Sequence, residues 1–159
     1  MNEEWRDVIG YEGLYQVSNF GNVRGKRGNL STADMLGYKR VVLYKDKKKK
    51  SLLVHRLVAH AFIGDNNGLH VNHIDMVRHN NNVENLEYVT HRENLTHGKV
   101  GSNLVGCYFD RKHNRWQARI FINGKSIYLG TFATEKEAHE QYMCELKKHG
   151  LENKYAEIT

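Results

Sequence analysis

The segment His70–His97 constrains the fold more than any other part of the chain. Strand-forming residues surround His73, an asparagine-rich turn follows, and Leu86–Val89 is again strand-like. Thr90–Glu93 then has the Ser/Thr-x-x-Glu form of a capping box, which predicts a helix from about His91 to His97. The order strand, loop, strand and helix predicts a small α+β unit.

Two strand-like runs, Tyr38–Tyr44 and Ser51–Val54, flank a stretch of six residues of which five are lysine. This pattern predicts a hairpin with a basic tip at 45–50. Repulsion among the lysines would be relieved beside a polyanion, through counterion release. Lys47, Lys48 and Lys49 are therefore candidate phosphate contacts, although a solvated loop tip would carry the same residues.

The C-terminal third predicts three antiparallel strands and a helix. Strand-like runs cover 106–111, 115–122 and 126–129, and Asn123-Gly124 is a strong signal for a hairpin turn. Thr134–Glu137 is a second capping box, so a helix is expected to start there.

Period-two alternation along the middle strand of this region sorts its two faces. One face is apolar and is expected to pack on the helix through Ala138, Tyr142 and Leu146: Trp116, Ala118, Ile120 and Ile122. The other face points away from the helix and carries Gln117, Arg119 and Phe121, with Ser126 and Tyr128 on the neighbouring strand.

Charge indicates the class of partner. Lys and Arg number 24 against 18 Asp and Glu, which gives a formal net charge of +6, and aromatic residues stand among the basic ones. This balance favours double-stranded DNA or another phosphate-rich partner over a merely basic soluble protein. The sequence has no run of about 18 apolar residues, so it predicts no membrane-spanning helix. With a polar start and only two cysteines, the expected compartment is a reducing cytoplasm, that of the host cell if the chain is phage-encoded.

Four blocks in the central segment follow one another in a characteristic order and spacing: Val71–Asp75, Asn80-Asn81, Asn85–Thr90 and Glu93-Asn94. They resemble the HNH family, also called the ββα-metal nucleases. The resemblance implies that His73 is the general base and that Asn85 braces the loop and orients this histidine. It also implies that Asn72 and Asn94 are the protein ligands of one divalent metal ion, Mg²⁺ or Mn²⁺.

The implied chemistry is hydrolysis of a DNA phosphodiester. A neutral imidazole can take a proton from an in-line water near its unperturbed pKa of about 6.5. A hard cation with oxygen ligands stabilises charge on the phosphate and on the departing oxygen. The expected products are a 5′-phosphate and a 3′-hydroxyl. Asn85 is expected to act either by accepting from the imidazole or by tying down its loop.

Two departures from the family pattern leave alternatives open. Homing enzymes of this group commonly have Asp where Asn72 stands, and an amide is the weaker ligand. Either the two asparagines suffice with the charge of the DNA phosphate, or Asp75 or Glu93 assists, or the site is inactive. Met76-Val77 also replaces the usual Gly-Asn, which bears on the turn geometry.

The flanking regions resemble two DNA-associated modules. Trp5, Gly10–Gly13, Tyr15–Asn19 and Gly21 resemble a nuclease-associated NUMOD module. Residues from Gly106 onward, including Trp116, Tyr128–Phe132 and Tyr142, resemble the sheet-and-helix DNA-binding domain of plant ethylene-response factors. In that family the sheet lies in the major groove. Three arginines are therefore candidates for guanine or phosphate contacts, besides the polar face named above: Arg111, Arg115 and Arg119.

These patterns together predict an α+β protein with five parts. They are a NUMOD-like module with the basic hairpin (1–50), an HNH core (51–98), a linker (99–103), a sheet-and-helix reader (104–150) and a tail (151–159). The expected function is that of a metal-dependent DNA endonuclease that nicks, with no small-molecule cofactor and as a monomer rather than a dimer. The alternative is a sequence-specific DNA-binding protein on an inactive HNH scaffold.

Overall fold

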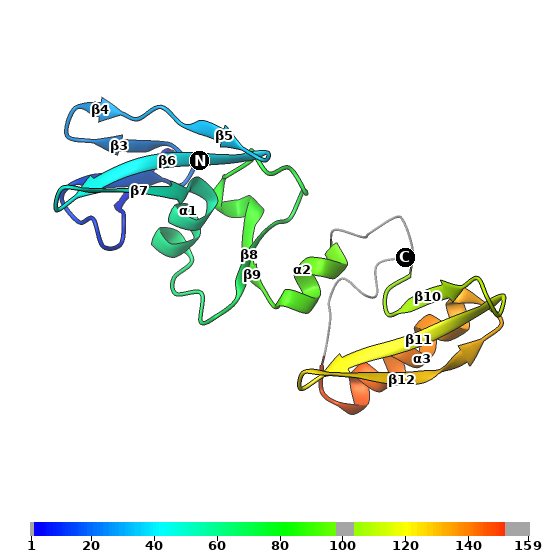
Figure 1. The fold of residues 1–159 in the computed structure, drawn as a ribbon. Helices are drawn as coiled ribbons and strands as arrows, with labels where there is room; N and C mark the ends of the chain where they lie inside the picture. Colours follow the sequence, from blue (N-terminus) through cyan, green and yellow to red (C-terminus); the bar gives the residue numbers. More distant parts are fainter. Residues whose placement is uncertain (1, 98–103, 152–159) are drawn as a thin grey trace. The chain divides into compact units, whose positions relative to one another are not determined.

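A computed structural model describes residues 2–97 and 104–151 of the chain. The chain divides into two compact units, Met1–Thr90 and His91–Thr159, and both mix helices with antiparallel sheets (Figure 1). The predicted α+β class is confirmed. The predicted linker at 99–103 and all but the first residue of the predicted tail lie outside the described residues.

The N-terminal part of the first unit is a four-stranded antiparallel sheet. Its strands follow one another in both sequence and space: β1 (Trp5–Asp7), β2 (Tyr15–Ser18), β3 (Val23–Gly25) and β4 (Gly28–Asn29). Glycines make its turns, as at Gly21, whose φ of +83° is costly for other residues. Val17 and Val23, paired across β2 and β3, are both buried in the core.

A second antiparallel sheet follows, made of β5 (Ala33–Met35), β6 (Tyr38–Lys45) and β7 (Lys48–Leu53). The predicted six-residue basic tip was wrong in one respect, because strand pairing extends to Lys45 and Lys48. Only Asp46 and Lys47 form the turn, both with positive φ, as a two-residue hairpin turn of type I′ requires. Lys48, Lys49 and Lys50 therefore lie exposed on a strand.

The rest of the first unit is α1 (Val54–Phe62), β8 (His70–His73), a short 3₁₀ helix η1 (Val83–Asn85) and β9 (Leu86–Val89). Both strands predicted on either side of the asparagine-rich turn are confirmed. β8 and β9 pair antiparallel. One core joins α1 to both larger sheets and to β9: Val8, Val17, Val23, Val41, Leu43, Val54, Val58 and Leu86.

The second unit begins with α2 (His91–His97), which has the predicted bounds. It continues with a three-stranded antiparallel sheet of β10 (Cys107–Asp110), β11 (Arg115–Ile122) and β12 (Lys125–Phe132), and ends with α3 (Glu135–Lys148). Thr134 and Glu137 form the predicted capping box. Ile120, Tyr142 and Leu146 are the buried centre of its core, as the alternation predicts.

No helix among the described residues is long and apolar enough to cross a membrane.

Candidate active site

His73 ends strand β8 and is buried beneath the loop that follows. Its Nε2 lies 3.2 Å from Oδ1 of Asn81. Because an amide oxygen only accepts hydrogen bonds, this contact requires a proton on Nε2. The neutral ring then presents Nδ1 as its proton acceptor.

The pKa of His73 is lowered below its usual value. Burial is the main cause; the hydrogen bond to Asn81 and the charge of Asp75 act in the opposite direction, and Arg78 lowers the pKa again. His73 is therefore neutral near pH 7, the state in which an imidazole can accept a proton.

Two aromatic rings lie beside His73, and neither was predicted from the sequence to belong to the site. The His55 ring of α1 lies 5.0 Å from that of His73, and the Tyr38 ring of β6 lies 6.0 Å from it. Burial, with a smaller effect of His73 and Arg56, lowers the pKa of His55 to about 3. Nδ1 of His55 and Nδ2 of Asn81 are buried without a hydrogen-bond partner among the described residues.

Asn85 holds the loop after β8 and does not reach the imidazole through any hydrogen bond described. Its Nδ2 donates to Oδ1 of Asp75 at 2.8 Å and to the carbonyl of Asn80 at 2.9 Å, while its Oδ1 accepts from the Asp75 amide. Of the two modes considered from the sequence, loop bracing fits these contacts. Asn81, from the second matching block, makes the contact with the imidazole.

The carboxylate of Asp75 is occupied within the same loop. Oδ1 also accepts from the amide of Val77, and Oδ2 accepts from Asn80 at 2.7 Å. The Asn80 hydrogen bond is the main reason that the pKa of Asp75 is lowered. Met76 has a φ of 62°, so it adopts the left-handed conformation that a glycine would occupy with less strain.

Asn72 is buried and pairs across the hairpin with Glu87. Its Nδ2 donates to Oε1 of Glu87 at 2.9 Å, which identifies Nδ2 as the amide atom that faces the carboxylate. Glu87 thus brings a carboxylate next to the amide whose neutrality was the weak point of the predicted ligand set. Asn94 lies on α2, in the second unit, and its place beside Asn72 stays a prediction.

The N-terminal module supports the loop that carries Asn81. A Cβ added at Gly21 would lie 2.7 Å from the Cβ of Asn81, so only glycine allows this approach. The carbonyl of Asn19 accepts from the amide of Val83 at 2.8 Å. The turn at 19–21 therefore fixes the loop on which the His73 hydrogen bond depends.

The sheet face that points away from α3 brings together three of the nine predicted DNA contacts: Gln117, Arg119 and Tyr128. Register pairs Arg119 with Tyr128 and Gln117 with Thr131, with a bulge after Ala118 that keeps Tyr128 beside Arg119. The guanidinium of Arg119 lies over the rings of Tyr108 and Tyr128, at 5.9 and 5.6 Å from their centroids.

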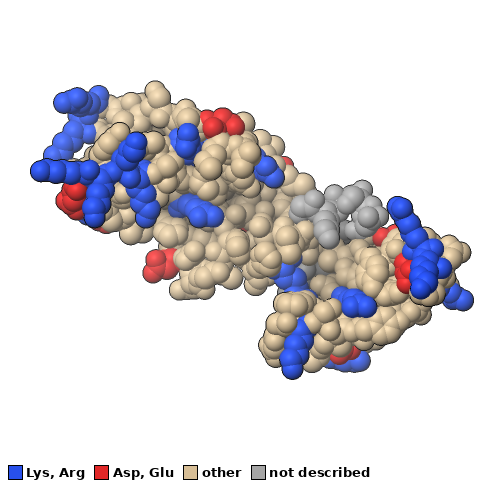
Figure 2. Space-filling model, in the orientation of Figure 1, with Lys and Arg blue, Asp and Glu red and all other residues tan. Residues whose placement is uncertain are grey.

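The remaining predicted contacts lie at the margins of this face or in the other unit. Ser126 pairs with Phe121, and Arg115 pairs with Asp110 at the far end of the strand. Arg111 lies in the turn between β10 and β11. Lys47, Lys48 and Lys49 belong to the hairpin of the first unit, and basic side chains gather on the visible surface of both units (Figure 2).

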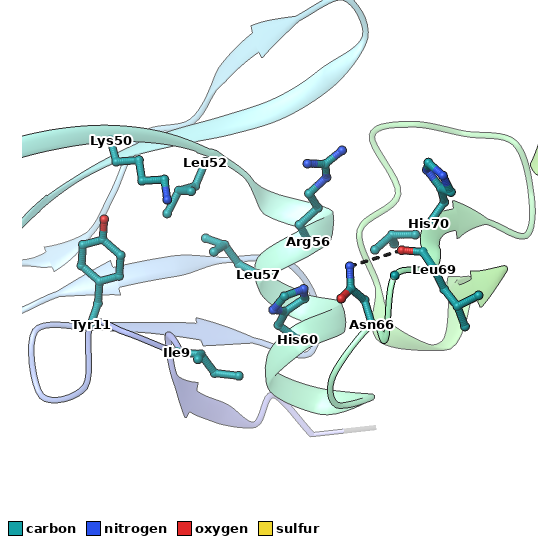
Figure 3. Close-up of a pocket in the computed structure, with 12 residues that line it drawn as sticks. Ile9, Tyr11, Lys50, Leu52, Arg56, Leu57, His60, Asn66, Leu69 and His70 are labelled. Carbon is teal, nitrogen blue, oxygen red and sulfur yellow. Dashed lines mark hydrogen bonds between the residues drawn. The ribbon is translucent and has the colours of Figure 1, made fainter. Parts of the chain in front are cut away.

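A pocket of about 520 Å³ lies against α1 in the first unit (Figure 3). Arg56 and His60 of α1, Lys50 of β7 and Tyr11 line it, together with apolar side chains such as Leu57. His70 and Val71 of β8, the strand that ends at His73, also line the pocket, whereas His73 itself does not.

A buried neutral histidine at the end of a two-stranded hairpin, an asparagine-braced loop, and a helix next in sequence define a ββα-metal nuclease of the HNH class. The HNH endonuclease family model HNH_3 matches residues 52–96, and the NUMOD4 motif matches residues 3–52. The chain therefore combines these two regions in the order expected from its sequence.

The relatives agree with these matches. The DNA endonuclease I-HmuI of Bacillus phage SP01 is 43% identical over 96 residues, covering 58% of this chain and 55% of that protein. The AP2-like ethylene-responsive transcription factor ANT of Arabidopsis thaliana is 40% identical over 65 residues, covering 38% of this chain and 12% of ANT.

A solved structure titled "DNA binding and cleavage by the HNH homing endonuclease I-HmuI" matches 94% of this chain and 91% of its own, with a TM-score of 0.58 and 30% identity. The chain belongs to the HNH homing endonuclease family. It spans about half the length of the curated relatives it matches first.

Proposed function

We propose that this protein is a metal-dependent DNA endonuclease of the homing type, which nicks one strand and leaves a 5′-phosphate and a 3′-hydroxyl. The observation that carries the proposal is the hydrogen bond between His73 Nε2 and Asn81 Oδ1. It leaves Nδ1 as the basic atom of a buried imidazole whose pKa is lowered, chiefly by burial.

In the proposed reaction Nδ1 of His73 accepts a proton from a water molecule in line with the scissile phosphorus. The oxygen of that water forms a bond to phosphorus, the bond from phosphorus to the 3′ oxygen breaks, and the departing 3′ oxygen takes a proton from solvent to give the 3′-hydroxyl. Asn81 keeps the imidazole in the required tautomer, and Asn85 keeps the loop in place through Asp75 and Asn80.

The donor set fits a hard divalent cation, Mg²⁺ or Mn²⁺, because it consists of oxygen atoms with a carboxylate at hand. The amide oxygens of Asn72 and Asn94 would hold the ion, and Glu87 would supply negative charge beside Asn72. When bound, the cation stabilises negative charge on the phosphate and on the leaving oxygen. No small organic cofactor is needed for this hydrolysis.

Duplex DNA is the proposed substrate. The sheet face with Gln117, Arg119, Ser126 and Tyr128 would read base edges, since a guanidinium can bind guanine bidentately. Arg111, Arg115 and the lysines 47–49 would contact phosphates. The similarity to AP2-like transcription factors supports this division of roles.

Nicking by a monomer follows from the number of active sites. Each chain has one His73, and one such site acts on one phosphodiester at a time. Cleavage of both strands would need a second chain or a second visit to the DNA.

Relaxation of supercoiled plasmid tests the proposed function. We expect wild type to convert plasmid to open circles with Mg²⁺ or Mn²⁺ and not with EDTA, and His73→Ala to abolish this. His149→Ala is the matched control because His149 is an exposed histidine at the end of α3. Ligation of the nick without kinase treatment would establish the 5′-phosphate and 3′-hydroxyl.

The second candidate is a DNA-binding protein on an inactive scaffold, and the amide at Asn72 is the observation that favours it. A wild-type protein that shifts DNA in gels, yet cuts under neither metal, would support this candidate and exclude the endonuclease.

A further inference from the structure

The turn between β5 and β6 holds an apolar side chain in a conformation that its residue type disfavours. Leu36 and Gly37 form a two-residue turn with φ values of 54° and 83°. Such turns favour Asn-Gly because both residues take positive φ. Leu36 is also 81% exposed, more than any other large apolar side chain among residues 2–97 and 104–151. The side chain therefore serves neither the turn nor the core.

This turn is held against the loop that follows the proposed catalytic histidine. Nη1 of Arg78 donates to the carbonyl of Leu36 at 3.1 Å, and Nε2 of His79 lies 2.5 Å from Oδ2 of Asp34. The guanidinium of Arg78 also lies over the ring of Tyr38, 4.9 Å from its centroid. The close approach of the two segments is visible in Figure 1.

The turn is linked to His73 through Tyr38, which directly follows Leu36-Gly37 and whose ring lies 6.0 Å from that of His73. Leu36 thus projects from a fixed support close to the proposed site of phosphodiester cleavage. A phosphate offers such a side chain nothing, because phosphate is charged and strongly hydrated. An apolar partner near a DNA phosphate is available in the stacked faces of the bases.

The loop that follows His73 and β8 also holds an exposed apolar residue at positive φ. Met76 has a φ of 62° and is 48% exposed, and its neighbours Ile74 and Val77 are also exposed. Two joined segments beside His73 thus each hold a bulky apolar residue in the left-handed region, with its side chain toward solvent. Arg78 and Lys39 lie on the same two segments and match a polyanion in charge.

We propose that Leu36 is a wedge that inserts at a base-pair step of bound duplex DNA beside the phosphate to be cut. The proposal rests on the proposed function. Apolar wedges of this kind, leucine included, unstack a step and bend the duplex. Unstacking would turn the phosphate of that step toward His73, so Leu36 would position the substrate and take no part in the chemistry.

Leu36→Asn tests the wedge without harming the turn, because Asn-Gly is the preferred pair for this geometry. The substrate is a duplex carrying a nick site mapped by run-off sequencing, with 2-aminopurine at the neighbouring step. Without divalent metal, wild type should raise 2-aminopurine fluorescence on binding, and Leu36→Asn should not. With metal, the variant should nick at least about tenfold more slowly, while its melting temperature stays equal or rises.

Two comparisons make the result specific. Ile9→Asn replaces another exposed aliphatic residue, 56% exposed and in the turn between β1 and β2, and should behave as wild type. A substrate with a mismatch at the same step is already unstacked, so it should restore most of the nicking rate of Leu36→Asn.

Equal fluorescence and equal nicking by wild type and Leu36→Asn would overturn the wedge and leave the endonuclease standing. If wild type does not cut, the proposed function fails, and the fluorescence test is repeated on a site selected from random DNA by binding. The wedge then fails if the variant still raises the signal or if no DNA is bound. Dimers in sedimentation that Leu36→Asn converts to monomers would overturn the wedge in favour of a contact between copies.

Discussion

Asn81 shows how one amide can determine what a histidine does. Its oxygen accepts from Nε2 of His73, and this leaves Nδ1 as the base. The same hydrogen bond raises the pKa of His73 against the larger effect of burial. Asn81, which takes no proton itself, therefore selects the tautomer of His73 and limits how far burial lowers its pKa.

Asn81→Ala should lower the nicking rate by roughly 10- to 100-fold, the range typical for partners that orient a functional histidine. Removal of the hydrogen bond also lowers the pKa of His73 further, since that bond raises it. The acidic limb of the rate against pH should therefore move to lower pH. Asn81→Asp should move it to higher pH, because a carboxylate favours the charged imidazole. If both variants changed the nicking rate but left the acidic limb of the pH profile where it is in wild type, Asn81 would not control the protonation of His73.

In the proposed metal site, Glu87 would supply the negative charge that the neutral amide of Asn72 lacks. Its carboxylate accepts from Asn72, which lies opposite it in the hairpin. Glu87→Gln keeps the size and removes the charge, so nicking should require roughly 10- to 100-fold more Mg²⁺. Titration of the nicking rate with Mg²⁺ measures this. Glu84→Gln, at an exposed position of η1, is the matched control.

His55 makes the stability of the first unit depend on pH. Burial lowers its pKa to about 3 in the folded state, whereas an unfolded histidine titrates near 6.5. Between these values the unfolded state binds more protons, so stability is lost as pH falls from about 6.5 toward about 3. Urea unfolding at pH 7.5 and pH 5 should show this decrease, and His55→Phe should reduce it. His73, whose pKa is also lowered, adds to the effect in wild type.

At the scale of elements, the N-terminal sheet supports the loop after β8, which carries Asn81. The turn after β2 accepts a hydrogen bond from Val83 and packs against Asn81. The module named for its association with nucleases thus has a definite structural task here. It fixes the loop that sets the tautomer of His73.

Gly21→Ala should destabilise the protein by about 1–3 kcal/mol and lower nicking, because the new Cβ would lie 2.7 Å from that of Asn81. Gly10→Ala is a matched control. Gly10 has a nearly equal φ of 81°, but nothing lies within 4 Å of an added Cβ. Both variants carry the backbone strain, so a similar decrease of nicking in both would contradict the support role. Thermal unfolding and plasmid relaxation give the two readouts.

At the scale of the whole molecule, two basic surfaces lie on different units. One is the lysine hairpin of β6 and β7, and the other is the sheet face around Arg119. The first offers flexible point charges, and the second a guanidinium beside two aromatic rings. They should contribute differently to DNA binding.

Replacement of Lys47, Lys48 and Lys49 by serine should weaken binding to all DNA sequences alike. It should also reduce the salt dependence of binding by about one unit of slope for each phosphate that a lysine no longer neutralises. Arg119→Ala should instead reduce discrimination between the mapped site and random DNA, at a cost of about 1–3 kcal/mol for the preferred site. Fluorescence anisotropy at several salt concentrations separates the two effects. Equal effects of both changes on specificity would contradict the division.

The sequence by itself determined the elements and the chemical class. Capping boxes, period-two alternation and the four ordered blocks predict α2, α3, the faces of β11 and the HNH site, because these features depend on residues close together in the chain. The hairpin tip at 45–50 was placed less well, since strand pairing across β6 and β7 decides where a turn begins.

Only the tertiary structure decided what surrounds His73. Tyr38 comes from β6, His55 from α1 and Asn81 from the loop after β8, and Gly21 reaches that loop from the N-terminal module. Glu87 meets Asn72 through strand register, and Leu36 reaches the catalytic loop through Arg78. Apart from the Asn81–His73 hydrogen bond, whose residues are eight positions apart, these contacts join residues well separated in the chain. The burial that lowers the pKa of His55 likewise exists only after the core has formed.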